Sequence, residues 1–169
     1  MVVRKEKSVK SVSERRAAPK EKMVSFGRAV ANFFKKYFKF GGVATRAEYW
    51  WATLFVFLVL LVVMILAVLV QPYNMLLAAV IALFWILFCV IIIVPMWSVA
   101  SRRLHDAGFS AKILLISLFF FIYAMLVPKY VVPGAWVIWA IDWLSFIWSV
   151  IMIILFVMPS KKQDNPYRD

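Results

Sequence analysis

Residues 52–70, ATLFVFLVLLVVMILAVLV, decide the fold, because these 19 consecutive residues carry no charge. A helix that rises ~1.5 Å per residue would make this stretch ~29 Å long, about the thickness of the hydrocarbon core of a bilayer. Tyr49, Trp50 and Trp51 precede it, and such aromatic side chains are enriched where a helix enters the membrane. The stretch therefore predicts a transmembrane helix over residues 49–70.

Three more apolar runs follow in the chain. They cover residues 75–100, 113–128 and 135–158 and are separated by more polar segments. Pro95 lies near the end of the second run and is expected to kink its helix or to end it early. Hydrophobic residues make up 65% of the chain, against roughly 45–50% in soluble domains. The sequence thus predicts an all-α, polytopic membrane protein with four transmembrane helices in one membrane domain, residues 23–160.

An amphipathic helix is expected before the first span, over residues 23–40. One face of this helix would be aromatic and apolar and the other mostly basic: Phe26, Val30, Phe33, Tyr37 and Phe40 against Arg28, Asn32, Lys35 and Lys39. Such a helix suits the headgroup layer of a membrane, although a helix packed on the protein's own loops would show the same pattern. Gly41 and Gly42 would end it, and Thr45 with Glu48 is a capping-box pattern for the next helix.

The distribution of basic residues predicts the orientation in the membrane. Residues 1–48 hold 13 of the 20 Lys and Arg residues. Within them, residues 1–22 have few large apolar side chains, which predicts a disordered basic tail. Segments 102–112 and 161–169 are also basic, whereas 71–74 and 129–134 contain only Lys129. Because basic segments stay in the cytoplasm, four spans with both termini cytoplasmic is the consistent topology.

The polar stretch 102–112, RRLHDAGFSAK, is the best candidate for a site, through Arg102, Arg103, His105 and Asp106. We expect it to be a loop, with the two arginines at the level of the lipid phosphates, which guanidinium groups bind in two-point fashion. The alternative is a simple cytoplasmic turn. The predicted topology puts the start of the first span at the same face of the membrane. Arg46 and Glu48 are therefore candidate partners of this loop, and the two arginines could pair with Asp106 and Glu48 in two-point geometry in place of a phosphate.

Asp142 is the only acidic residue inside an apolar run. Intramembrane carboxylates often line polar paths, but the neighbouring Trp136, Trp139 and Trp143 also fit an interfacial position. With one cysteine, Cys89, and one histidine in the chain, no metal site or cofactor is expected. No nucleophile constellation is recognisable, so an enzyme is not expected either.

Two stretches of the chain resemble a known family. Residues 37–58, YFKFGGVATRAEYWWATLFVFL, and residues 102–110, RRLHDAGFS, are similar to the bacterial inner-membrane family called domain of unknown function 805. That family typically shows an aromatic-Gly-Arg-x-x-Arg-x-Glu-aromatic-Trp sequence before its first span and Arg-Arg-Leu-His-Asp-x-Gly before its third. The matching positions are Phe40, Gly41, Arg46, Glu48, Tyr49, Trp50, Arg102, Arg103, Leu104, His105, Asp106, Gly108 and Ser110.

The resemblance covers about residues 33–167, with some departures. Gly42 stands where the family usually has Arg, and residues 111–112 replace its usual Gly-Trp. Of the Gly-x-Asn-x-Tyr-Gly-type tail that is common in the family, Asn165 and Tyr167 are present. The resemblance implies a location in a bacterial inner membrane and no particular chemistry.

Two hypotheses of function remain from the sequence. The first is a non-enzymatic membrane protein that binds lipid, through anionic headgroups, or a protein partner. The alternative is a subunit of a small homo-oligomeric transporter or channel, which Asp142 and His105 would favour. Nucleic acid is not an expected partner, because the basic N-terminal tail lacks interleaved aromatic residues.

Overall fold

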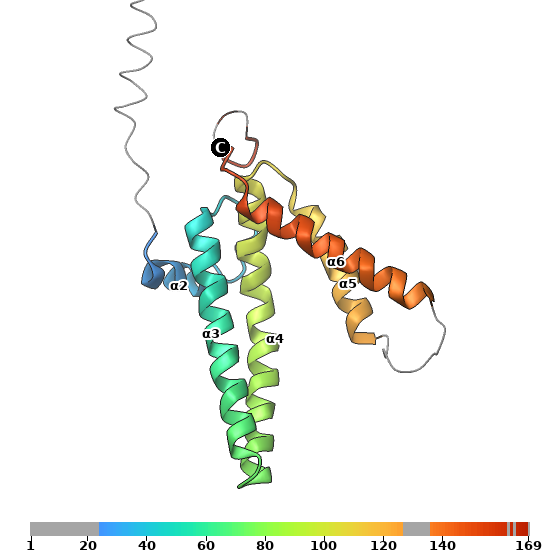
Figure 1. The fold of residues 1–169 in the computed structure, drawn as a ribbon. Helices are drawn as coiled ribbons and strands as arrows, with labels where there is room; N and C mark the ends of the chain where they lie inside the picture. The colour runs from blue at the N-terminus through green and yellow to red at the C-terminus, as the bar shows by residue number, and fades with distance from the viewer. Residues whose placement is uncertain (1–23, 127–135, 162, 164, 169) are drawn as a thin grey trace, which may run out of the picture.

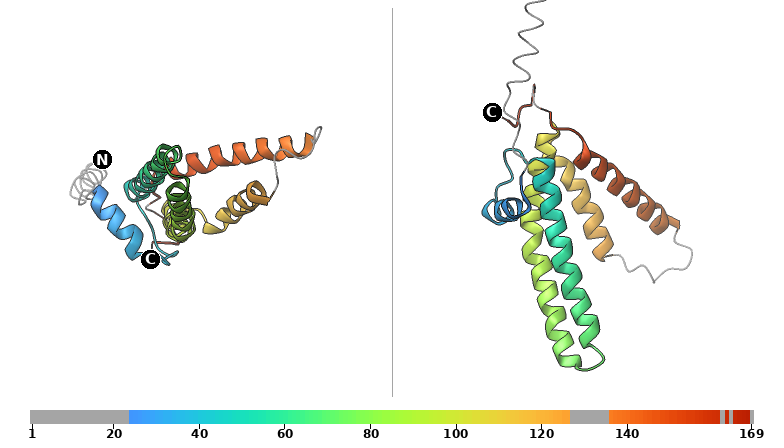
Figure 2. Two further views of the ribbon diagram at one scale, coloured as in Figure 1. Left: turned by 90° about the horizontal axis from the view of Figure 1, so that it is seen from below. Right: turned by 60° about the vertical axis from the view of Figure 1, so that its left-hand side comes forward.

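The computed structural model describes residues 24–126, 136–161, 163 and 165–168, and in this part of the chain the regular structure is helical, with no strand. The helices are α2 (Phe26–Lys35), α3 (Arg46–Val70), α4 (Met75–Asp106), the 3-10 turn η1 (Ala111–Ile113), α5 (Leu114–Leu126) and α6 (Trp136–Val157). The predicted tail 1–22 and the turn 129–134 lie outside the described residues. α3 and α4 form a long antiparallel hairpin (Figure 1). α5 and α6 extend from one side of it and α2 from the other (Figure 2).

α3 begins at the cap that the sequence predicts. Thr45 is the N-cap, and its hydroxyl oxygen accepts a hydrogen bond of 3.2 Å from the backbone N–H of Glu48. The Glu48 carboxylate reaches away from this cap and contacts Arg102 of α4. Thus the Thr45 half of the capping box is formed, while the acidic side chain is used for a contact with α4.

α4 is longer than the predicted span 75–100, because it continues to Asp106. Its 32 residues correspond to ~48 Å of helix, well over the ~30 Å of a hydrocarbon core. α4 continues through Pro95, so of the two expected outcomes, a kink or an early end, the early end does not occur. Proline removes the N–H that would bond to the carbonyl four residues earlier, and here the hydroxyl of Tyr37 donates to that carbonyl, of Ile91.

α2 is shorter than the predicted helix 23–40. It ends at Lys35, and the chain then crosses α4 as an irregular segment. Ser98 Oγ lies 2.8 Å from the carbonyl oxygen of Lys36 and 2.7 Å from that of Lys39, and Ser101 Oγ donates to the carbonyl of Phe40 over 2.8 Å. These side-chain donors satisfy carbonyls that a continued helix would have bonded internally, so Tyr37 and Phe40 are not on the helix.

The apolar surface of the helices identifies their environment. Three helices, α3, α4 and α6, are long and apolar enough to cross a membrane, and the segment Ala111–Leu126 is a shorter apolar helix. Large apolar side chains point outward along all of them, for example Val68, Val90 and Phe119, each about 60% exposed. So much exposed apolar surface along helices of this length is typical of a lipid environment. The structure therefore confirms the prediction of an all-α, polytopic membrane protein.

Candidate functional site: a polar cluster and an apolar crevice

The polar residues Arg102, Arg103, His105 and Asp106 form the last turn of α4 and not a loop, contrary to the sequence-based expectation. This turn lies at the end of the molecule where α3 begins and where α4 and α6 end, which we call the polar end (Figure 1). Two main-chain hydrogen bonds bring these segments together: Ala44 N donates to Arg102 O over 3.0 Å, and Lys161 N donates to Asp106 O over 2.8 Å. The arginine side chains described below add further contacts. The end of α4 thus contacts the segment before α3 and the segment after α6.

Arg102 connects α4 to α3. Its side chain is 1% exposed, and Nη1 donates to Glu48 Oε1 over 2.7 Å. Lys36 Nζ lies 3.6 Å from the same carboxylate oxygen. The Nε and Nη2 atoms of Arg102 have no hydrogen-bond partner among the described residues. Only one edge of this guanidinium is therefore used by the protein.

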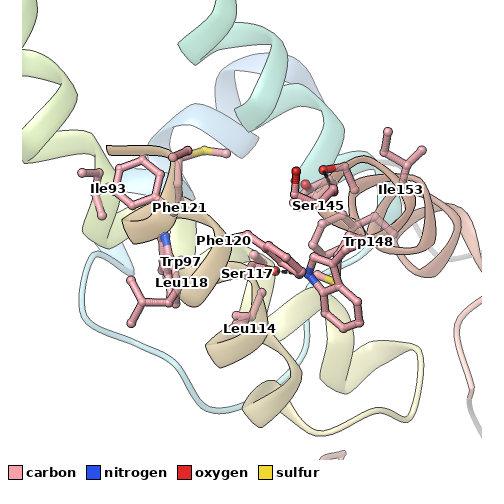
Figure 3. Close-up of a pocket in the computed structure, with 17 residues that line it drawn as sticks. Ile93, Trp97, Leu114, Ser117, Leu118, Phe120, Phe121, Ser145, Trp148 and Ile153 are labelled. Atoms are coloured by element: carbon pink, nitrogen blue, oxygen red, sulfur yellow. Dashed lines mark hydrogen bonds between the residues drawn. The ribbon is translucent and has the colours of Figure 1, made fainter. Parts of the chain in front are cut away.

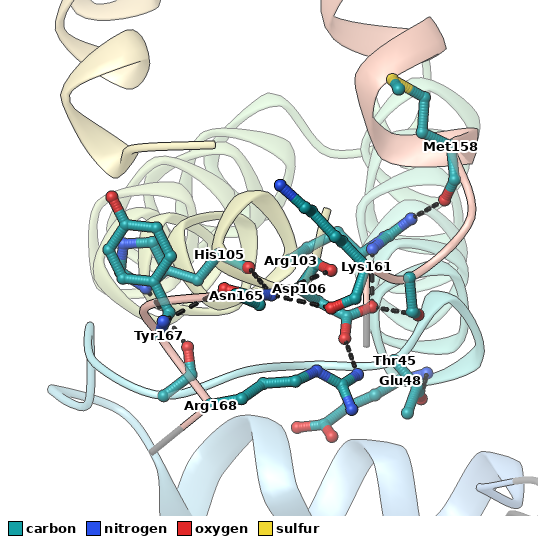
Figure 4. Close-up of polar contacts among 12 residues, drawn as sticks. Thr45, Glu48, Arg103, His105, Asp106, Met158, Lys161, Asn165, Tyr167 and Arg168 are labelled. Carbon is teal, nitrogen blue, oxygen red and sulfur yellow. Dashed lines mark hydrogen bonds and ion pairs between the residues drawn. The ribbon is translucent and has the colours of Figure 1, made fainter. Parts of the chain in front are cut away.

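Arg103 connects α4 to α6 and uses all three of its nitrogen atoms. Its side chain is fully buried; Nε donates to the carbonyl of Phe156 over 3.0 Å, and Nη2 donates to the carbonyl of Met158. Nη1 donates to Asp106 Oδ2 over 2.8 Å. Phe156 is in the last turn of α6 and Met158 directly follows the helix, where backbone acceptors have no intrahelical partner. Arg103 thus caps the C-terminus of α6 (Figure 4).

Asp106 is the shared acceptor of the cluster. Its buried carboxylate accepts from Arg103, from the hydroxyl of Ser160 and from the guanidinium of Arg168 (Figure 4). A buried carboxylate is stable only when it is paired and hydrogen-bonded in this way. The contacts attach the chain segment after α6 to the end of α4.

His105 forms the second attachment of the C-terminal segment. Asn165, 7% exposed, donates from Nδ2 to the carbonyl of His105 over 2.8 Å and to that of Lys161 over 3.0 Å. The ring of Tyr167 stacks on the His105 ring, with 4.0 Å between centroids and 9° between planes. On its other side His105 Nδ1 lies 3.2 Å from the carbonyl oxygen of Gly42. The histidine is therefore held between the segment before α3 and the segment after α6.

The chemistry of this polar cluster is pairing within the protein. The two arginines are turned inward and pair with Glu48 and Asp106, which is the pairing that the sequence offered beside a contact with lipid phosphate. Arg46, a second candidate partner, is exposed, and no hydrogen bond or ion pair joins it to the cluster in the described part of the chain. No group of three His, Cys, Asp or Glu side chains that could hold a metal ion occurs among the described residues.

Asp142 lies apart from the polar cluster. It is on α6 in a shallow hollow with Trp139, Trp143 and Phe146, and its carbonyl accepts a hydrogen bond of 2.8 Å from Ser145 Oγ. The structure therefore separates the two polar candidates that the sequence singled out.

Several residues of the cluster were missed from the sequence. Ser160 and Arg168 sit in a short polar tail that gives no local signal of their partners. Ser98 and Ser101 could have been found, because two serines three residues apart in an apolar run lie on one face of a helix. The family resemblance included Asn165 and Tyr167 without giving them a partner. Both contact His105, in segment 102–110 of the same resemblance.

A crevice adjoins the polar cluster on the side of α5 and α6. It has a volume of about 550 Å³ and is lined by α4, α5, α6 and Tyr49 of α3 (Figure 3). Most of its lining is apolar, for example Trp97, Phe121 and Ile153. Tyr49 packs on Phe156 at its upper limit, with 4.3 Å between ring centroids. Phe156, whose carbonyl accepts from Arg103, lines the crevice, which therefore reaches the part of α6 that Arg103 caps and continues between α4, α5 and α6.

The fold and these contacts define a class: a small polytopic α-helical membrane protein whose helices are fastened at one end by a buried network of paired charges. The family model described as "Protein of unknown function (DUF805)" matches residues 37–169, so the chain belongs to this family. The match confirms the resemblance noted from residues 37–58 and 102–110 and includes the C-terminal segment that docks on them. Neither the curated proteins nor the solved structures contain a match to this chain.

Proposed function

We propose that this protein is a non-enzymatic membrane protein that binds a lipid, with a hydrocarbon chain of the lipid in the crevice. The observation that carries the proposal is that polar side chains lining the crevice form hydrogen bonds within the protein. Trp148 Nε1 donates to Ser117 Oγ over 2.9 Å, and the hydroxyls of Ser145 and Ser149 donate to backbone carbonyls of α6 over 2.8 Å. These groups are satisfied within the protein, so an apolar ligand leaves none of them without a partner.

The size and position of the crevice agree with such a ligand. Its volume of about 550 Å³ falls within the roughly 300–1,000 Å³ that is typical of sites for small molecules. It lies between helices that expose apolar side chains on their outer faces, so lipid chains surround it in the membrane. We accordingly propose that it takes up a chain from the bilayer.

We further propose four membrane crossings in a bacterial inner membrane, with both termini in the cytoplasm. The starts and ends of the helices support this topology: the start of α3 and the ends of α4 and α6 meet at the polar end. Because the ends of α4 and α6 lie side by side, the number of crossings between them is even. α5 and α6 supply these two crossings.

Transport, the alternative hypothesis, has less support. It depended mainly on Asp142, which lies in a separate hollow and does not line the crevice. No observation in the described part of the chain favours an ion path over a lipid chain, and transport remains a prediction from the sequence alone.

The test is saturable labelling of the detergent-solubilised full chain by a phosphatidylcholine with a diazirine in its acyl chain. Labelled peptides should come from the crevice faces of α5 and α6. Ala124→Phe places a ring in the crevice and should strongly reduce labelling. Met125→Phe, at the next residue of α5 but outside the lining, is the matched control and should label as the parent does. Equal labelling of both variants would contradict the proposal, and so would a dimer in which a second copy covers the crevice.

A further inference from the structure

Two lysines, Lys112 and Lys161, lie close in the chain to residues that line the crevice near the polar end. Lys112 in η1 is two residues before Leu114, and Lys161 follows Phe156 of α6; both of these apolar residues line the crevice. The side chains of both lysines are exposed. Lys112 therefore lies shortly before α5 in the chain, and Lys161 lies shortly after α6.

The packing around Gly108 brings Lys161 to the turn that precedes η1, the element that contains Lys112. Gly108 has φ +86°, and a Cβ at this position would lie 2.8 Å from Cδ of Lys161. The Lys161 side chain thus lies against the turn between α4 and η1, four residues before Lys112. In Figure 4 it points away from the Asp106 carboxylate.

Neither lysine forms an ion pair with another described residue. The described carboxylates at the polar end are Glu48 and Asp106, and both are already paired with arginines. Within the described part of the chain, the positive charges of Lys112 and Lys161 are thus not paired with a carboxylate. A lipid that has its chain in the crevice would carry its headgroup to this level.

From this arrangement we infer that the bound lipid is an anionic phospholipid, with its phosphate at Lys112 and Lys161 and its chain in the crevice. The inference rests on the proposed function and adds the headgroup class. The phosphate contact is thus assigned to Lys112 and Lys161, which form no ion pair with a described residue. Arg102 and Arg103 are buried and already paired with carboxylates. Lysine ammonium groups hold a phosphate as point charges and adapt to its position through flexible stems.

The experiment compares two photoactivatable lipids with identical chains, phosphatidylglycerol and phosphatidylcholine, supplied in equal amounts to the solubilised full chain. The parent should prefer phosphatidylglycerol. Lys112→Gln and Lys161→Gln should each lower that preference by about fivefold. Labelling by phosphatidylcholine should fall less, because the choline ammonium balances the charge of its phosphate. Lys35→Gln, an exposed lysine on α2 that is outside the crevice, makes the same change in net charge and should leave the preference intact.

The outcomes separate the two proposals. If the lysine variants keep the parent's preference, or if Lys35→Gln lowers it equally, the headgroup site is wrong while the chain site stands. If Ala124→Phe changes the labelling by neither lipid, the chain site itself is wrong. Inorganic phosphate at matched ionic strength should not alter the labelling; selective loss of the phosphatidylglycerol signal would mean that the lysines bind free phosphate and would overturn the lipid assignment.

Discussion

The hydroxyl of Tyr37 donates a hydrogen bond to the main-chain carbonyl of Ile91, four residues before Pro95. Proline at position 95 cannot donate to that carbonyl, so a side chain from the segment after α2 replaces the missing helical bond. This relationship explains how α4 passes through a proline and reaches the polar end as one helix. It also fixes the segment after α2 against α4.

Tyr37→Phe should therefore destabilise the protein by about 1 kcal/mol, the usual net value of one hydrogen bond. In the background of Pro95→Ala the same change should cost much less, because the new N–H of residue 95 bonds to the Ile91 carbonyl. Thermal unfolding of the four proteins of this double-mutant cycle measures the coupling. Tyr73→Phe, in the exposed turn before α4, is the control and should be neutral. Additive effects of Tyr37→Phe and Pro95→Ala would show that the two positions are not linked.

Substitution by lysine should lower the stability of the protein by different amounts at the two arginines of the cluster. Arg103→Lys removes at least two of three hydrogen-bonded contacts, each worth roughly 1.5–3 kcal/mol for a charged donor, and should cost about 3 kcal/mol or more. Arg102→Lys keeps a single donor for Glu48 and should cost about 1 kcal/mol. Thermal stability in detergent gives the comparison. Equal losses in the two variants would contradict the observed difference in pairing.

Asn165→Ala should release the C-terminal segment from α4. The variant loses the donor to the carbonyls of His105 and Lys161, at a cost of about 1–2 kcal/mol. The rate of carboxypeptidase digestion of the tail should rise together with this loss. Gln163→Ala is the matched control, because Gln163 is an exposed residue of the same segment. If both variants are digested at the parent's rate, Asn165 does not hold the tail.

Topology is tested by reporter fusions. Fusions after Lys22, at Ala107 and after Asp169 should report the cytoplasm, and a fusion at Tyr73, between α3 and α4, should report the opposite side. Lys129, between α5 and α6, should also report the opposite side, because the ends of α4 and α6 meet. A cytoplasmic signal at Tyr73 or Lys129 would rule out four crossings.

The sequence by itself determined the features that depend on neighbouring residues. Uncharged runs specify membrane helices because each residue contributes independently to transfer into lipid, and Thr45 starts α3 through a bond to the backbone only three residues away. The family could likewise be inferred from two short segments, and the family model matches both of them.

Only the tertiary structure decided the direction of Arg102 and Arg103, the continuation of α4 through Pro95 and the place of the C-terminal tail. The contacts responsible join residues more than fifty positions apart, such as Arg102 with Glu48 and Arg103 with Phe156. A local pattern of charges cannot tell an arginine that faces lipid phosphate from one that is buried against a carboxylate. The difference depends on which acceptor the folded chain brings within hydrogen-bond distance, since a buried guanidinium is stable only with such a partner.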